Sequence, residues 1–318
     1  MKNLSVKLRP QASGVALVEL MISLLIGLIL MAGVFQIFVK SRATYSAHDE
    51  SLRLQENLRF ASHLLAEDLR SAGYLGCTSL VEHIEPEIIF DTSELANFNP
   101  SAGIQGWKED PGGIGLANDE AVAGTDIFRI WRGGENIPLD AGTEKLSEVL
   151  VVSDCSQVIV AKASDVEYTE SSSAVKVGSF NLDKPAEALR LVSHLYYIGK
   201  RTANSQPSLY RRPLLGDGSG KVGLAEELIE GVENMQLLYG VDSNGDREVD
   251  SYVSAEDVPD WQSVVSVKVA LLLASADDVR TEASSETFDL LGTEVSSPSD
   301  RRMRRVMTST IALRNRSL

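Results

Sequence analysis

The sequence predicts an α+β protein in which a long N-terminal α-helix is packed on a mostly antiparallel, β-rich head domain. Three observations support this fold class. Residues 15–39 form an apolar run that contains a single ionisable residue, Glu19. Apolar residues then recur at helical spacing as far as Gly73, and later segments alternate with the period of two that is typical of strands.

The apolar run is long enough to cross a membrane as a helix. Residues 15–39 would extend about 37 Å, and the hydrocarbon core of a bilayer is about 30 Å thick. A secretory signal peptide has a shorter apolar region, which is removed with the signal. Here a short basic leader ends at Gly14, directly before the apolar run. Removal of this leader would therefore leave the apolar segment in the mature protein.

The helical pattern continues beyond this run. No proline occurs in residues 11–85, and no glycine lies between Gly33 and Gly73. An apolar stripe at three- and four-residue spacing consists of Leu54, Leu58, Ala61, Leu65 and Leu69. We therefore expect one helix over residues 15 to about 72, roughly 85 Å long, whose outer half packs on the head.

The N-terminal arrangement resembles the signal of type IV pilins and of type II secretion pseudopilins. In that family a membrane peptidase cuts after a glycine, methylates the new N-terminus and leaves a glutamate as fifth mature residue. The matching positions are Gly14 and Val15 for cleavage and N-methylation, and Glu19 for assembly. The sequence departs from the family pattern at Val15, where Phe is usual.

The resemblance gives Glu19 a role. A carboxylate in the bilayer core costs about 2.5–3.5 kcal/mol on insertion scales, so such a residue usually has a partner. In pilins the implied partner is the free α-amine of a neighbouring subunit. The alternative is an ordinary single-pass anchor whose glutamate lies near the cytoplasmic headgroups.

Other segments are similar to the PilW family of minor pilins. The segment from Arg70 to Cys77 resembles the turn that leads from the long helix to the first cysteine in that family. Further similarity lies in residues 228–242, 264–273 and 305–316, whereas residues 90–220 carry little.

The resemblance implies a structural protein, not an enzyme, that is cut by prepilin peptidase and held in the bacterial inner membrane. It implies that the protein helps to prime type IV pilus assembly near the pilus tip. Its partners would be other minor pilins and the major pilin, through the helix, and a tip adhesin. The alternatives are a J-type pseudopilin of type II secretion and, from another class, a membrane-anchored periplasmic binding protein or enzyme.

The expected organisation has four parts: the leader, 1–14; the membrane half of the helix, 15–39; its amphipathic half, 40–72; and the head, 73–318. The leader carries three cations and no acid, which favours a cytoplasmic N-terminus and a periplasmic head. After assembly the protein would be located in the pilus, at the cell surface.

The charge balance argues against nucleic acid as a partner. The formal net charge is −15, and loss of the three leader cations takes it to about −18. Six arginines gather near the C-terminus, where a solvated strand edge or contact with an acidic neighbour explains them: Arg301, Arg302, Arg304, Arg305, Arg314 and Arg316.

Cys77 and Cys155 are the two cysteines of the chain. In an oxidising periplasm a single pair is more often bridged than free, so we predict a disulfide between them. Two buried thiols are the alternative.

The middle and the C-terminal part are predicted to contain strands joined by loops. The expected strands are 126–131, 148–152, 158–161, 188–198, 208–211, 235–241, 265–271 and a closing strand, 306–313. Residues 97–115, which contain Trp107, are expected to form a long surface excursion, and residues 164–173 a loop.

No cofactor is required by this interpretation, but one loop has oxygen ligands at alternating positions, as a Ca²⁺ site would. The candidate ligands are Asp242, Asn244, Asp246 and Asp250. The loop is not an EF-hand, because its sixth position is Arg247 instead of glycine. The alternative is a hairpin turn with solvated acids, since Asn-Gly is itself a strong turn signal.

Overall fold

The computed structural model describes most of the chain, in segments separated by gaps. The described residues are 13–79, 86–89, 102–112, 114, 116, 120–140, 143, 148–168, 174–183, 185–202, 205–213 and 223–315. The predicted leader, 1–14, therefore lies almost wholly outside the described residues. The chain forms two compact units, Met1–Glu50 and Ser51–Leu318, so its division falls inside the predicted amphipathic half of the helix.

The first element is α1 (Ser13–Ser71), a single helix of 59 residues. It ends one residue before the predicted position. Gly73 follows with a φ of 74°, a left-handed conformation that glycine adopts without strain, and its N–H donates to the carbonyl of Trp131 at 2.9 Å. The glycine thus ends the helix and directs the chain into the head.

The larger sheet has eight strands, and β11 is its central element. Its members are β3 (Glu87–Ile88), β4 (Ile104–Trp107), β5 (Ile127–Ile137), β6 (Val149–Ser153), β7 (Val158–Lys162), β11 (Glu187–Lys200), β12 (Pro207–Pro213) and β13 (Glu226–Glu230). The order is β13-β12-β11-β6-β7-β3, and β5 pairs with both β11 and β4. All pairs are antiparallel except β3 with β7.

A second sheet has four antiparallel strands in the order β15-β14-β16-β19. They are β14 (Val232–Val241), β15 (Ser251–Val253), β16 (Val264–Ala274) and β19 (Arg304–Ala312). The smaller elements are β1 (Tyr74–Leu75), β2 (Thr78–Ser79), η4 (Ala163–Asp165), β8 (Val166–Glu167), β9 (Ala174–Val177), β10 (Phe180–Asp183), η5 (Ala255–Asp257), η6 (Trp261–Ser263), β17 (Thr287–Leu290) and β18 (Thr293–Ser296).

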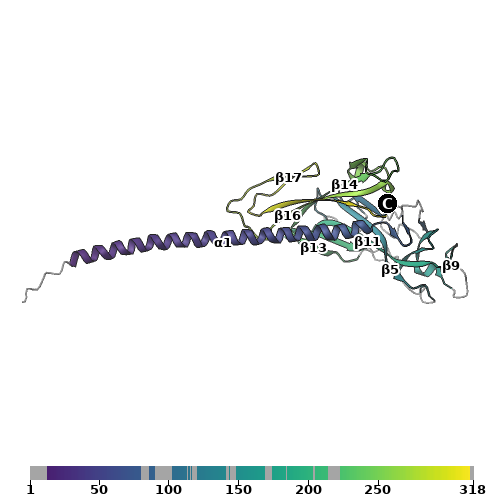
Figure 1. Ribbon diagram of the computed structural model, residues 1–318, viewed down its shortest axis with the longest axis horizontal. Coiled ribbons are helices and arrows are strands. Elements are labelled where there is room, and N and C mark those ends of the chain that lie inside the picture. The colour runs from purple at the N-terminus through teal and green to yellow at the C-terminus, as the bar shows by residue number, and fades with distance from the viewer. Residues whose placement is uncertain are drawn as a thin grey trace, which may run out of the picture. The chain divides into compact units, whose positions relative to one another are not determined.

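The main hydrophobic core is shared by the outer half of α1 and the two large sheets. Figure 1 shows β14 and β16 on one side of this part of the helix and β11 and β13 on the other. The buried side chains that meet include Leu54, Ala61, Leu65 and Leu69 of the helix, Phe128, Ile130 and Tyr196 of the larger sheet, and Met235, Leu237, Val269 and Leu271 of the smaller one. Burial of each leucine contributes about 1.5–3 kcal/mol, so the stripe predicted from the sequence fixes the helix to the head.

The predicted fold class is confirmed: one long apolar N-terminal helix and a mostly antiparallel, β-rich head. The predicted strands correspond to β5, β6, β7, β11, β12, β14, β16 and β19.

The expectation that residues 97–115 form a long surface excursion was wrong in part. Ile104–Trp107 is β4, paired with β5, and Ile104 and Ile114 are buried. Residues 97–101 lie outside the described residues. Residues 164–173 also differ from a plain loop, because η4 and β8 occupy their first part and residues 169–173 are not described.

Candidate functional site

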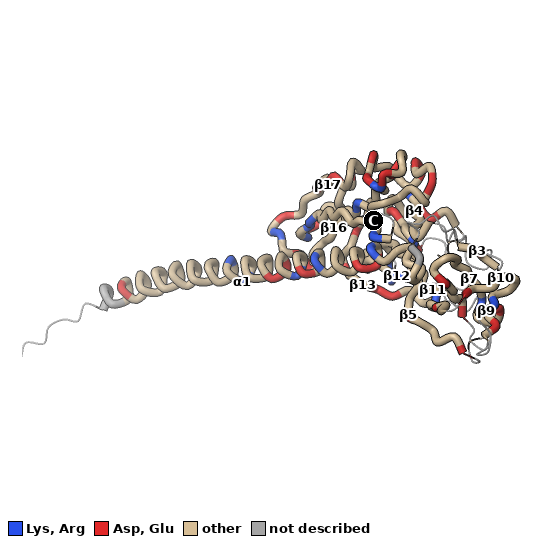
Figure 2. The backbone as a smooth tube through the Cα atoms, turned by 45° about the vertical axis from the view of Figure 1, so that its right-hand side comes forward, with Lys and Arg blue, Asp and Glu red and all other residues tan. Residues whose placement is uncertain are grey.

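The apolar half of α1 is an exposed surface. Seventeen large apolar side chains from Leu17 to Val39 are between 49% and 72% exposed. Figure 2 shows this stretch of the helix as nearly free of charged residues. One helix in the described part of the chain is long and apolar enough to cross a membrane, and this is that helix. Such a surface needs a bilayer or other apolar helices around it.

Glu19 lies in the second turn of α1 and is exposed. Its backbone carbonyl accepts a hydrogen bond from Ser23 Oγ at 2.7 Å, one turn further along the helix. That bond uses the backbone carbonyl of Glu19, so it does not satisfy the carboxylate. Gly14 and Val15 also lie within the first turn of α1, and the side chain of Val15 is outside the described part. The predicted cleavage and the predicted pairing of Glu19 stay predictions.

The outer half of α1 is held by a polar contact as well as by its apolar stripe. Asp68 is buried, and its Oδ2 lies 2.9 Å from His194 Nδ1 and accepts a hydrogen bond from the hydroxyl of Tyr196. The guanidinium of Arg132 lies 3.9 Å from Oδ1 of the same carboxylate. One helix side chain thus contacts β11 twice and β5 once.

The electrostatics of this cluster favour the ionised carboxylate. Burial on its own would raise the pKa of Asp68, but the hydrogen bonds from His194 and Tyr196 and the nearby Arg132 lower it overall. Burial and the neighbouring carboxylate raise the pKa of Tyr196, so its hydroxyl remains a donor. The cluster places the donor groups of three side chains around one carboxylate, an arrangement suited to fixing the helix.

The C-terminal strand runs alongside the outer half of the helix and is tied to it at both ends. Arg305, at the start of β19, donates to Ser51 Oγ at 3.2 Å. Asn315, just beyond β19, donates through Nδ2 to the carbonyls of Ser71 at 3.4 Å and Ala72 at 3.1 Å. These are carbonyls at the helix end, which have no partner within a helix. The end of the chain therefore caps α1.

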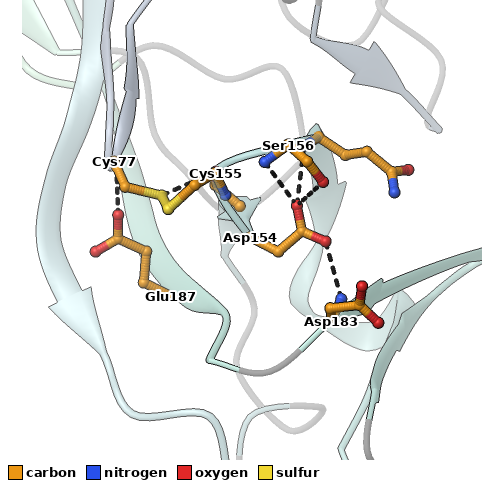
Figure 3. The surroundings of a disulfide bond; sticks show 8 residues. Cys77, Asp154, Cys155, Ser156, Asp183 and Glu187 are labelled. Carbon is orange, nitrogen blue, oxygen red and sulfur yellow. Dashed lines mark hydrogen bonds between the residues drawn. A yellow bond between two sulfur atoms is a disulfide. The ribbon is translucent and has the colours of Figure 1, made fainter.

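The structure joins Cys77 and Cys155 in a disulfide, as the sequence predicted, with an S–S distance of 2.09 Å. Figure 3 shows two carboxylates that accept hydrogen bonds close to the disulfide, one near each cysteine. The N–H of Cys77 donates to Glu187 Oε1 at 2.5 Å. Asp154 accepts from the N–H and hydroxyl of Ser156 and reaches the N–H of Asp183 at 2.8 Å. The disulfide thus connects the turn after α1 to the β6–β7 loop.

The predicted calcium loop follows β14, and its side chains do converge. Asp242 accepts hydrogen bonds from the N–H groups of three residues: Asn244, Gly245 and Arg247. Arg247 has a φ of 68°, so the sixth position adopts the left-handed turn for which an EF-hand uses glycine.

The loop does not present a cation site in this conformation. Asn244 directs its amide nitrogen, not its oxygen, at Asp246 and Asp250, at 3.1 and 3.3 Å. Across the described residues, no group of three or more His, Cys, Asp or Glu side chains is arranged to hold a metal ion. Calcium binding would require Asn244 to rotate, and it stays a proposal.

Sequence reasoning missed Asp68 and His194, which lie 126 positions apart in the chain. One signal was present. Asp68 stands next to Leu69 and three residues after Leu65, and is therefore on the apolar side of the helix, away from the charged face. An acid at such a position needs a buried partner.

Comparison with known proteins adds two family matches. Residues 195–315 match the family model described as Type IV Pilus-assembly protein W, and residues 9–35 match the prokaryotic N-terminal methylation motif. Among solved structures, the chain is similar to a type IV-like pilin, TTHA1219, from Thermus thermophilus, at 14% identity and a TM-score of 0.38. That similarity covers 84% of this chain and 99% of the other. No curated protein matches the chain.

Proposed function

We propose that the chain is a minor pilin of the PilW family that primes pilus assembly near the filament tip, which its matches to the PilW family model and to the N-terminal methylation motif support. The observation that carries the proposal is the uncovered apolar half of α1, which contains one carboxylate, Glu19, near its start. A structural role through helix packing follows from this surface, and catalysis has no part in it.

The proposed sequence of events begins at the inner membrane, with the N-terminus in the cytoplasm and the head in the periplasm. Prepilin peptidase cuts between Gly14 and Val15 and methylates Val15. The helix then leaves the lipid for a bundle of pilin helices, in which the amine of a neighbouring subunit neutralises Glu19. Other minor pilins and the major pilin are the proposed partners, and a tip adhesin is the proposed cargo.

The test replaces Glu19 with Gln, which keeps the size of the side chain and removes its charge. We expect the E19Q protein to stay in the membrane at normal abundance but to fail in restoring pili to a deletion strain. Ser23→Ala is the matched control, because Ser23 lies one turn away and contacts only a backbone carbonyl. S23A should restore pili.

Two results would overturn the proposal. One is a mature protein whose N-terminus, by mass spectrometry, is Met1 or a residue beyond Ala32 instead of a methylated Val15. The other is normal piliation by the E19Q protein, which would indicate that the helix is only an anchor. A deletion that impairs protein secretion and leaves pili intact would favour the pseudopilin alternative.

The loop from Asp242 to Asp250 is proposed as a calcium site, supported by its three carboxylates and the left-handed Arg247. The test measures the melting temperature of the full chain in detergent with calcium, with magnesium and with a chelator. If the loop binds calcium, then calcium, and not magnesium, should raise the melting temperature, because a ligand that binds only the folded state raises its stability. Asp246→Asn should abolish the calcium effect, and an equal response to magnesium would contradict the proposal.

A further inference from the structure

A cavity of about 520 Å³ lies beside β4, on the head. One wall is β4 with the residues that follow it, and the other comes from η5 and η6. The side chains that matter for its chemistry are Trp107, Lys108, Glu109, Asp110, Glu256 and Trp261. None of them belongs to the helix surface or to the loop proposed for calcium.

Two of the three tryptophans of the chain line this cavity, and both are half-buried. Trp261 is fixed by an edge contact with the buried Tyr239, with ring centroids 4.8 Å apart. Trp107 already holds a cation, since the guanidinium of Arg129 lies 5.5 Å from its ring centroid. Both rings therefore have a fixing contact and also line the cavity.

The charges of the cavity are mostly negative. Glu109, Asp110 and Glu256 supply three carboxylates. Lys108 is the single basic residue of the lining, and its ammonium is directed at Gln236 Oε1, at 3.0 Å, and at the buried Asp126, at 3.5 Å. The net charge of the lining is therefore negative, within a chain whose formal charge is −15.

We infer that this cavity binds an organic cation, a guanidinium or alkylammonium group, between the tryptophan rings and the carboxylates. An aromatic face attracts such a cation by about 0.5–2 kcal/mol, and the carboxylates add attraction from the same side. A phosphate or another anion would be repelled. The inference concerns ligand chemistry and does not depend on the proposed assembly role.

The cation can come from a basic side chain of another protein or from a free polyamine, and the experiment separates these sources. The full chain in detergent is titrated with the capped peptide acetyl-Gly-Arg-Gly-amide, with the same peptide carrying citrulline, and with spermidine. The readout is tryptophan fluorescence, to which the two cavity rings contribute. Trp131, the third tryptophan, is fully buried, so its emission is expected to respond to unfolding instead.

We expect a saturable change with a cation and binding of the neutral citrulline peptide that is about tenfold weaker. The arginine peptide binding more tightly than spermidine would identify a protein side chain as the source, and the reverse order a polyamine. Glu256→Gln should weaken binding about fivefold, and Trp261→Phe should do the same and reduce the signal. Glu294→Gln, an exposed acid on β18, is the matched control and should bind like the wild type.

Several results would overturn the inference: no saturable change with either cation, equal binding of the arginine and citrulline peptides, or equal effects of E256Q and E294Q. Saturation by a neutral disaccharide in place of the cations would do so as well. Should W261F fail to fold, E256Q still decides the matter, because Glu256 is exposed.

Discussion

Asp68 on α1 and His194 on β11 meet at 2.9 Å in the head, although 126 positions separate them in the chain. The contact joins the end of the long helix to the central strand of the larger sheet. Tyr196 and Arg132 complete the set of donors around the same carboxylate. The helix is therefore fixed at a particular register along the sheet, which apolar packing alone specifies less strongly.

Replacing Asp68 with Asn should lower the free energy of unfolding of the head by about 2 kcal/mol, because charge-assisted hydrogen bonds are lost in a buried site. The folded-state pKa of Asp68 is lowered. Its contribution is therefore present above the unfolded pKa and disappears as the pH falls through the folded pKa. The difference between D68N and the wild type, measured by chemical denaturation, should thus shrink towards acid pH. A difference that grows on acidification would contradict this account.

Asp126 is expected to have the opposite pH dependence. Its N–H donates to the carbonyl of Met235 and its carboxylate accepts from the N–H of Leu237, at 2.9 and 2.7 Å, so it bridges the start of β5 to β14. Burial raises its pKa to about 6, and the hydrogen bond from Leu237 and the charge of Lys108 offset only part of this effect. Between roughly pH 4 and 6 the folded state binds a proton that the unfolded state has lost, so stability decreases as the pH rises.

Asp126→Asn should remove this decrease of stability with rising pH. Relative to the wild type, the variant should gain about 3 kcal/mol between pH 4 and pH 7, because one pKa unit corresponds to about 1.4 kcal/mol. Its amide oxygen can still accept from Leu237. The measurement is a pair of denaturation curves at each pH, and a constant difference between the two proteins across this range would refute the prediction.

The disulfide should contribute about 4 kcal/mol, because Cys77 and Cys155 close a loop of 78 positions. Reduction of the wild type should lower the melting temperature of the head by several degrees. The C77S/C155S double variant is the control: it should melt at the lower temperature with or without reductant. Unchanged melting of a wild type whose thiols react freely after reduction would count against this role.

The sequence predicted the elements whose patterns are local. The stripe from Leu54 to Leu69 and the alternation in β14 and β16 arise because each element buries one face. The sequence did not predict β4, because Ile104 stands among glycines. The strand forms because β5 pairs with it. The contacts of Asp68 with His194 and of Asn315 with Ala72 depend on tertiary placement over more than a hundred positions, which periodicity does not carry.

Gly106 gives the last prediction, since it permits the approach of β4 to the second sheet. A Cβ at this position would lie 1.8 Å from the hydroxyl oxygen of Tyr239 and 2.5 Å from the ring carbon that bears it. Gly106→Ala should therefore destabilise the head by about 1–3 kcal/mol, the range for overpacking. Tyr239→Phe is the informative companion, because it removes a buried hydroxyl that has no hydrogen-bond partner in the described structure. Y239F should melt at or above the wild-type temperature while G106A melts below it. Equal melting of G106A and the wild type would show that β4 can move away from Tyr239 at no cost.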